Sequence, residues 1–253
     1  MARSAFFAGS TPRVIAHRGL TLRAPENSLL AFLQALSLGV THLETDVRAT
    51  RDGVAVLAHD ADFRRLLGRS ERIAVLSFAQ LSLIDLGVDQ RVASLRQALD
   101  AFPEARFNLD IKSADAVQPT VDAILWAQAT GRVLVTSFSE ARRRAAVAQL
   151  PGVATSASAR LVTLAYLAAQ LRLAPLVDRV LRNVDAVQLP ERFHGVRILS
   201  ERTLTLLRRN HREVHVFTVN DLAQMRRLWR SGVDGLVTDR SDLAQIEVEN
   251  FTQ

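Results

Sequence analysis

Three carboxylates and one lysine occupy alternate positions in two short apolar segments of the chain. Glu44 and Asp46 are two residues apart in the first segment, and Asp110 and Lys112 are two apart in the second. If both segments are β-strands, the members of each pair point to the same face, because side chains alternate along a strand. Charged groups on a largely buried face are costly unless they pair or bind something. We therefore predict that these four side chains meet at one functional site.

A divalent cation would suit this acidic cluster. Neighbouring carboxylates repel one another unless a positive charge lies between them, and Mg²⁺ or Ca²⁺ prefers a site built of oxygen atoms. Zinc is less favoured, since it prefers His or Cys ligands and the chain has no Cys. An ion-pair network of the same acids with Arg48 or Lys112 explains the spacing equally well. The spacing alone leaves both interpretations open.

Two histidines could complete the chemistry. His17 ends the first predicted strand, and His59 follows an extended piece at 54–58. Because imidazole titrates near neutral pH, two histidines close to an acidic cluster can act as a general acid and a general base. The other four histidines lack such neighbours and are predicted to be structural or surface residues: His42, His194, His211 and His215. Of these, only His215, which lies inside a predicted strand, is kept as a reserve candidate for the site.

The elements that position these residues alternate between short apolar strands and helices. Such alternation indicates β-α-β units and a parallel sheet, and eight strands in 253 residues favour a closed α/β fold, the TIM (β/α)8 barrel, which typically has about 250 residues. The predicted strands are 13–16, 43–47, 107–111, 133–136, 153–155, 186–189, 214–219 and 235–238. Helical patterns are predicted near 29–36, 116–130, 139–149, 159–182, 200–210 and 221–231.

We expect one domain over residues 1–253 with a single irregular region. Residues 60–104, between the second and third barrel strands, break the alternation and contain helix-like pieces near 77–85 and 94–102. This region is predicted to be a small insertion or lid at the top of the barrel. Catalytic residues of such barrels lie at the C-terminal ends of the strands, where the acidic cluster and both histidines fall.

The composition argues against several other classes of protein. A chain without Cys has no disulfide scaffold and no thiol nucleophile. The pI is about 11.1, but the net charge is only +6. Lys112 is the single lysine among 32 Lys and Arg residues, so few groups titrate at alkaline pH and the pI is high without a large charge. Nucleic acid is therefore not an expected partner. No segment resembles a membrane span or a secretory signal, so we expect a cytoplasmic protein without an integral membrane segment. The oligomeric state stays open.

The order of these features resembles the glycerophosphodiester phosphodiesterase family. The resemblance is most specific over about 45 residues and has weaker echoes along the rest of the chain. The carrying motifs are His17-Arg18-Gly19, Pro25-Glu26-Asn27-Ser28, Glu44-Thr45-Asp46-Val47, Asp52-Gly53 and His59-Asp60, followed by Asn108-Leu109-Asp110-Ile111-Lys112, Phe217-Thr218-Val219-Asn220 and 232–239.

The resemblance implies hydrolysis of a small-molecule glycerophosphodiester to glycerol 3-phosphate and an alcohol, with one divalent cation, Mg²⁺ or Ca²⁺. It also implies roles for single residues. His17 and His59 would be the general acid and base, in an order that the sequence does not set. The remaining implied roles are metal ligation by Glu44, Asp46 and Asp110, phosphate binding by Arg18 and Lys112, and shaping of the first loop by Glu26 and Asn27, with Glu26 a candidate further ligand.

Two departures from the family pattern concern the site. Asp110 stands where the family usually has a glutamate, and Phe217, a predicted substrate-pocket residue, stands where tryptophan is frequent. Two alternatives remain beside the main reading: a phospholipase D-like barrel that acts on lysophospholipids, and a non-catalytic barrel that binds phosphodiesters.

Overall fold

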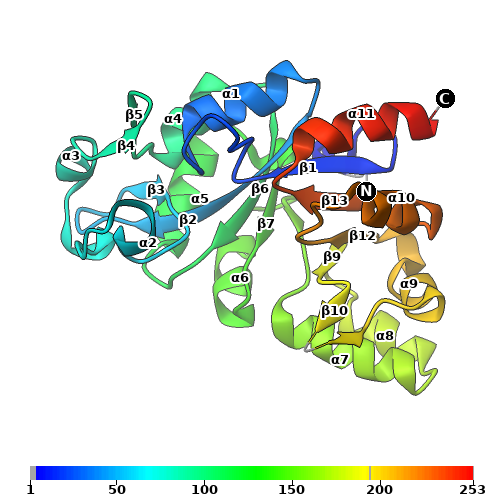
Figure 1. Cartoon of the computed structure of the whole chain (residues 1–253). Helices are drawn as coiled ribbons and strands as arrows, with labels where there is room; N and C mark the ends of the chain where they lie inside the picture. The colour runs from blue at the N-terminus through cyan, green and yellow to red at the C-terminus, as the bar shows by residue number, and fades with distance from the viewer. Residues whose placement is uncertain (1–3, 194, 253) are drawn as a thin grey trace.

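The computed structural model describes residues 4–193 and 195–252, so the prediction for His194 lies outside the described residues. It confirms the predicted barrel (Figure 1): eight parallel strands lie side by side in the order β8-β7-β6-β2-β1-β13-β12-β9. A parallel bridge between Ser156 and Ala186 joins the two outer strands and nearly closes the ring. The barrel strands are β1 (Arg13–His17), β2 (His42–Ala49), β6 (Arg106–Ile111), β7 (Val133–Thr136), β8 (Ala154–Thr155), β9 (Ala186–Leu189), β12 (Glu213–Val216) and β13 (Gly235–Thr238).

Helices follow the strands and cover the outside of the barrel. Their buried apolar side chains pack with the outward-facing side chains of the strands, such as Phe107, Leu109 and Ile111, in the main hydrophobic core. The helices are α1 (Leu29–Ser37), α4 (Leu95–Ala101), α5 (Val117–Trp126), α6 (Glu140–Val147), α7 (Ala159–Gln170), α8 (Ala174–Val180), α9 (Glu201–Leu207), α10 (Leu222–Arg230) and α11 (Ser241–Thr252), with 3₁₀ turns η1 (Ala5–Phe7), η2 (Ile73–Val75), η3 (Thr130–Arg132) and η4 (Arg209–His211).

Two element predictions need correction. The helix predicted at 159–182 is two helices, because Arg172 has a positive φ of 60° and Pro175 begins a new helix, α8. The strand predicted at 214–219 is Glu213–Val216, and Phe217 lies in the loop that follows it. None of the helices in the described part of the chain is both long and apolar enough to cross a membrane.

The amino-terminal end of the barrel is closed by buried groups. Phe6 from η1 is fully buried against the barrel, and its carbonyl oxygen lies 2.9 Å from Nε2 of His42. Burial lowers the pKa of His42 to about 3. Arg13 and Glu213 form a buried ion pair at 2.8 Å, and His215 contacts the same carboxylate at 3.0 Å. His42 and His215 are therefore structural, and the functional residues lie at the opposite end.

The insertion is smaller than predicted. Strand β3 (Ala55–Leu57) pairs antiparallel with β2, and the segment up to about Val92 contains α2 (Arg64–Leu67), α3 (Phe78–Leu81), β4 (Asp85–Gly87) and β5 (Gln90–Arg91) around a small separate core. Helix α4, predicted as part of the insertion, instead packs in the main core and belongs to the barrel wall.

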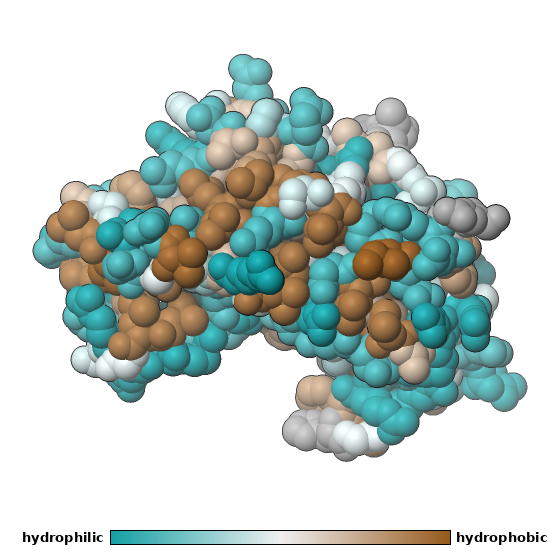
Figure 2. All heavy atoms as spheres, turned by 45° about the horizontal axis from the view of Figure 1, so that its top comes forward, coloured by the Kyte–Doolittle hydropathy of each residue, from teal (hydrophilic) through white to brown (hydrophobic). Residues whose placement is uncertain are grey.

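A second short hairpin lies at the far side of the barrel mouth. It consists of β10 (Arg192–Phe193) and β11 (Val196–Arg197), and the sequence analysis did not predict it. Figure 2 shows the outline of the molecule hollowed between the insertion on the left and the lobe that carries this hairpin at the lower right. The surface between them mixes polar and apolar atoms.

Candidate active site

The strand register brings the predicted carboxylates together. Strands β2 and β6 are parallel neighbours in which Glu44 lies beside Asn108 and Asp46 beside Asp110. All four side chains are buried, with Asp46 only 1% exposed. Because residues two apart share a face, the acids point inward over the top of the barrel, while the apolar residues at alternate positions, such as Val47 and Leu109, face the helices.

Lys112 connects the carboxylates of the two strands. Its Nζ atom lies 2.7 Å from Oδ1 of Asp46 and 2.6 Å from Oδ2 of Asp110. The ion pair that the spacing allowed with Lys112 is thus present. Arg48 does not take part in it, since its guanidinium donates to the carbonyl oxygen of His59 at 2.7 and 2.9 Å.

Burial and neighbouring charges act differently on the three acids of the cluster. Burial and the charge of Asp46 raise the pKa of Glu44 to about 8. Burial also raises the pKa of Asp110, in spite of the Lys112 ammonium. Asp46 behaves differently: burial opposes its ionisation, but Lys112 and Arg18 outweigh it and hold the pKa below the usual range. Lys112 and Arg18 thus offset the burial of the acids fully only at Asp46, and a further cation would favour the ionised forms of Glu44 and Asp110.

The first loop folds tightly beside the carboxylates. Gly19 has a φ of +84°, and a Cβ there would lie 2.7 Å from the backbone of Ala31, so only glycine fits. The preceding residue, Arg18, donates its backbone N–H to Oε2 of Glu44 at 3.1 Å and its Nη1 to Glu26 at 3.0 Å. The His-Arg-Gly motif thus places a guanidinium over the acidic cluster.

Asn27 and Glu26 act on the site through contacts with other side chains. The amide nitrogen of Asn27 donates to Oδ2 of Asp46 at 3.2 Å, and its Oδ1 accepts from the Thr45 hydroxyl at 2.7 Å. Glu26 accepts hydrogen bonds from Arg18 and from a guanidinium of the insertion, Arg65, at 2.5 and 3.0 Å. Both residues shape the first loop, and the carboxylate of Glu26 is already paired.

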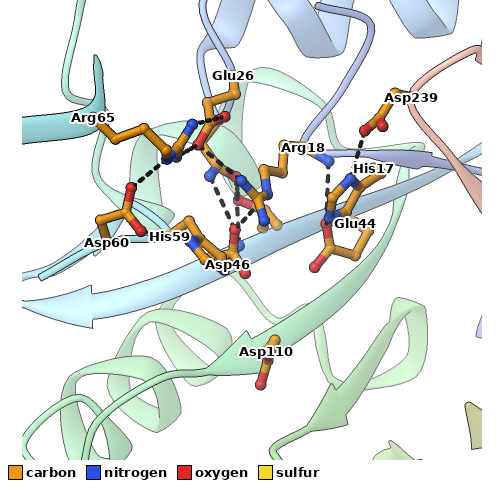
Figure 3. A network of polar contacts seen from close by, with 12 residues as sticks. His17, Arg18, Glu26, Glu44, Asp46, His59, Asp60, Arg65, Asp110 and Asp239 are labelled. Carbon is orange, nitrogen blue, oxygen red and sulfur yellow. Dashed lines mark hydrogen bonds and ion pairs between the residues drawn. The ribbon is translucent and has the colours of Figure 1, made fainter. Parts of the chain in front are cut away.

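His17 lies between two carboxylates (Figure 3). Its Nδ1 is 2.6 Å from Oδ1 of Asp239, and its Nε2 is 3.9 Å from Oε2 of Glu44. Asn220 fixes Asp239 in turn, because its amide nitrogen donates to Oδ2 at 2.7 Å. Burial disfavours the imidazolium, but the bond to Asp239 and the charge of Glu44 outweigh it and raise the pKa of His17.

His59 has a similar carboxylate partner. Its Nδ1 lies 2.8 Å from Oδ1 of Asp60, and Arg65 holds the other oxygen of Asp60 at 2.6 Å. His59 is also close enough to Asp46 for its charge to lower the pKa of that carboxyl. In Figure 3 the chain of contacts runs from Asp60 through Arg65 to Glu26. The insertion therefore supplies one histidine together with the ion pairs that hold it.

An aromatic pair stands at the mouth beside Lys112. Phe217, the predicted pocket residue, lies edge-on to Phe138 with ring centroids 6.5 Å apart. Phe138 is 60% exposed, and the Lys112 ammonium lies 5.9 Å from its ring centroid. The two rings form an apolar wall next to a charged site.

The sequence analysis missed several partners of the predicted residues. Asp239, Asp60 and Phe138 come directly after or close to the end of a strand, so the rule that singled out His17 could have found them. Arg65 belongs to the insertion, and no spacing in the sequence signals its contact with Glu26.

The donor set fits a hard divalent cation. Glu44, Asp46 and Asp110 offer only carboxylate oxygens, and Oδ1 of Asp110 is buried without a hydrogen-bond partner. Among the described residues, however, no three acidic or His side chains are gathered closely enough to form a ready metal cluster. Lys112 occupies the position between Asp46 and Asp110, so a cation bound to both acids requires that its ammonium moves.

Together, a nearly closed parallel barrel and a mouth with two histidines, buried acids and fixed cations define an enzyme that acts on an anionic substrate. Comparison with known sequences gives the family: the sequence model of the glycerophosphoryl diester phosphodiesterase family matches residues 17–243. The chain belongs to this family and is a phosphodiesterase.

Three relatives illustrate the similarity. The chain is 41% identical over 231 residues to "Probable glycerophosphodiester phosphodiesterase 2" of Mycobacterium tuberculosis, covering 90% of this chain and 88% of that protein. It is 33% identical over 113 residues to a lysophospholipase D of Rattus norvegicus, covering 40% of this chain and 36% of that protein. A solved phosphodiesterase of Oleispira antarctica, in complex with its product sn-glycerol-3-phosphate, shares the fold with a TM-score of 0.77 at 22% identity, covering 94% of this chain and 97% of that chain.

Proposed function

We propose that the protein hydrolyses glycerophosphodiesters to glycerol 3-phosphate and an alcohol with a divalent cation and with His17 and His59 as the acid–base pair. The observation that carries the proposal is the matched environment of the two histidines. Each has a carboxylate on Nδ1, Asp239 for His17 and Asp60 for His59, and both lie beside the Glu44–Asp46 acids. A carboxylate on Nδ1 fixes the tautomer and leaves Nε2 for proton transfer.

The chain's own cations would hold the substrate. The phosphodiester is a monoanion, and Arg18 and Lys112 offer a guanidinium and an ammonium from the ends of β1 and β6, the two strands that flank β2. Fixed cations of this kind stabilise the charge that develops on phosphate in the transition state. The wall of Phe138 and Phe217 would then face the organic part of the substrate.

One histidine would accept a proton from the nucleophile, and the other would donate a proton to the oxygen of the leaving alcohol as its bond to phosphorus breaks. The nucleophile is either water or the neighbouring glycerol hydroxyl, which would give a cyclic phosphate first. Detection of a cyclic phosphate by ³¹P NMR during turnover distinguishes the two routes.

A cation would be held by Glu44, Asp46 and Asp110. When bound, it would supply Lewis-acid neutralisation of the phosphate charge. Asp110 is one methylene shorter than a glutamate, but its Oδ1 is buried and has no hydrogen-bond partner, so it would be available as a ligand. Mg²⁺ and Ca²⁺ both suit these ligands.

The proposal is tested by incubating the purified protein with glycerophosphocholine and glycerophosphoethanolamine and measuring released glycerol 3-phosphate with a coupled dehydrogenase assay. We expect turnover with Mg²⁺ or Ca²⁺ present. No release from any member of a panel of such diesters, with Mg²⁺, Ca²⁺ and Mn²⁺ each supplied, would contradict it.

Metal removal is the first prediction. Treatment with EDTA is expected to lower the rate by more than about tenfold, because the acids then lose the charge that offsets their repulsion. Addition of Mg²⁺ or Ca²⁺ in excess of EDTA should restore the rate, measured in the same glycerol 3-phosphate assay. A rate that is unchanged after exhaustive chelation would show that Lys112 and Arg18 suffice without a metal.

The second prediction concerns Asp239. Asp239→Asn removes a charge-assisted hydrogen bond to His17 and should lower kcat/KM by about 10- to 100-fold. Since Asp239 raises the pKa of His17, the pKa falls in the variant, and the limb of the pH–rate profile that reports His17 moves to lower pH whether the residue is acid or base. Asp242→Asn, which removes a carboxylate that forms an ion pair with Arg240, is the matched control and should leave the profile in place.

Lysophospholipids are the second candidate substrates. The exposed ring of Phe138 at the mouth and the partial match to a lysophospholipase D favour this alternative. Faster release of the alcohol from acylated than from deacylated diesters would support it. We also propose a cytoplasmic location, which fractionation of cells that express a tagged protein tests.

A further inference from the structure

Two arginines stand at the carboxylate site without a carboxylate partner. Arg48 donates from Nε and Nη2 to the carbonyl oxygen of His59. Arg142, in α6, donates from Nη1 to the carbonyl oxygen of Lys112. In the described part of the chain, no carboxylate oxygen lies within 4.0 Å of either guanidinium. They differ in this from Arg18 and Arg65, which both pair with carboxylates.

Both arginines lie above the acids rather than on the outer surface. Arg48 is two residues beyond Asp46 on β2 and therefore shares its inward face, about 7 Å further toward the mouth. Arg142 reaches the end of β6 at Lys112 and is near enough to Asp110 for its charge to lower the pKa of that carboxyl. Both side chains are half-buried. They form the next layer of the site above Asp46 and Asp110.

The electrostatics of this layer favour an anion. Arg48 directly follows Val47, whose carbonyl oxygen accepts from the Lys112 N–H, and Arg142 donates to the carbonyl oxygen of Lys112, so both arginines lie at the same end of the β2–β6 pair. Two guanidiniums of like charge repel each other, and an anion between them would relieve this repulsion. Because backbone carbonyls already hold both side chains in place, they need little rearrangement when an anion binds. The planar fork of arginine suits a phosphate or a carboxylate.

We propose that Arg48 and Arg142 bind a second negative charge of the substrate, so that the enzyme prefers glycerophosphodiesters whose alcohol carries a phosphate or a carboxylate. The inference rests on the proposed function, in which Arg18 and Lys112 hold the reacting phosphate. The second charge then lies one step further toward the mouth, beside Phe138. A neutral or cationic alcohol leaves the two arginines without a partner.

Two substrates that differ by a single phosphate test the proposal. We would measure kcat/KM for glycerophosphoglycerol and for the same diester with a terminal phosphate on the leaving glycerol. The wild type should favour the phosphorylated substrate by about tenfold or more, and added salt should reduce the preference. In Arg142→Gln the ratio should fall toward one, and Arg142→Lys should keep part of it. Arg144→Gln, on the exposed side of the same helix, should leave the ratio unchanged.

The ratio of the two kcat/KM values distinguishes recognition of the second charge by Arg142 from a purely structural contact of Arg142 with Lys112. If Arg142 only supports the Lys112 carbonyl, Arg142→Gln slows both substrates equally and the ratio stays as in the wild type, which would overturn the proposal. A wild-type ratio of one or less would overturn it while the proposed function stands. Loss of turnover on both diesters would overturn the two together. Inhibition by inorganic phosphate is measured last, in the wild type and in Arg142→Gln. If phosphate inhibits only when Arg142 is present and the wild type shows no substrate preference, the two arginines bind free anions and the proposal is overturned.

Discussion

Replacing either His17 or His59 with alanine is expected to lower kcat/KM for a glycerophosphodiester by about 10²–10⁴-fold, the contribution of a positioned acid or base. The wild-type pH–rate profile should be bell-shaped, and each variant should lose one limb. The limb lost with His17 then shows whether it is the acid or the base. Because the two act in one reaction, the double variant should be little slower than the slower single variant.

The controls for this prediction lie elsewhere in the chain. His211→Ala removes an exposed imidazole from η4, on the far side from the barrel mouth, and should leave kcat/KM near the wild-type value. Added imidazole should restore part of the activity of His17→Ala if the ring transfers a proton. A variant that folds, shown by an unchanged circular dichroism spectrum, and still hydrolyses the diester at the wild-type rate would remove that histidine from the mechanism.

The barrel could be predicted from the sequence because its signals are local and repeated. Each strand is a short apolar run, each helix has an apolar face, and their alternation fixes a parallel sheet. Where the alternation carried no local signal, the predictions failed. The β10–β11 hairpin has two residues in each strand, too few to show a period, and the break between α7 and α8 was signalled only by Pro175.

In the candidate site, too, contacts with a local sequence signal could be predicted and contacts without one could not. Strand parity predicts that Glu44 and Asp46 share a face with Asp110 and Lys112 across β2 and β6, and the register places them there. Barrel closure sets β13 beside β1 with Ala16 opposite Thr238, so the contact between the next residues, His17 and Asp239, was accessible to the same reasoning.

The contacts made by the insertion were not accessible in this way. Arg65 meets Glu26, which lies 39 residues earlier in the chain, because the insertion folds back over the barrel mouth, and loop paths have no period in the sequence. Arg48 illustrates the same limit. Parity places it inward, but only the structure shows that it donates to a carbonyl and, among the residues described, pairs with no carboxylate.

Lys112→Arg is expected to lower kcat by about 10²–10³-fold while the protein still folds, although the formal charge is unchanged. The ammonium fits between Asp46 and Asp110 at 2.7 and 2.6 Å. A guanidinium is longer and planar, so it cannot take this position without moving Asp46, which Asn27 and Arg18 also hold. Thermal unfolding and steady-state kinetics on the same preparation measure the two effects separately.

The same strand offers a matched exchange in the opposite direction. Arg106, at the other end of β6, donates to the carbonyl oxygen of Ala5, and Arg106→Lys should leave kcat unchanged. Lys112→Met removes the charge as well as the shape and should be slower than Lys112→Arg, because Asp46 and Asp110 then lose their common partner. Apart from Lys112, all Lys and Arg positions of the chain hold arginine. Near-normal turnover of Lys112→Arg would therefore mean that the single lysine has no special role. A large loss confined to position 112 would show that the site requires a compact ammonium between the two acids.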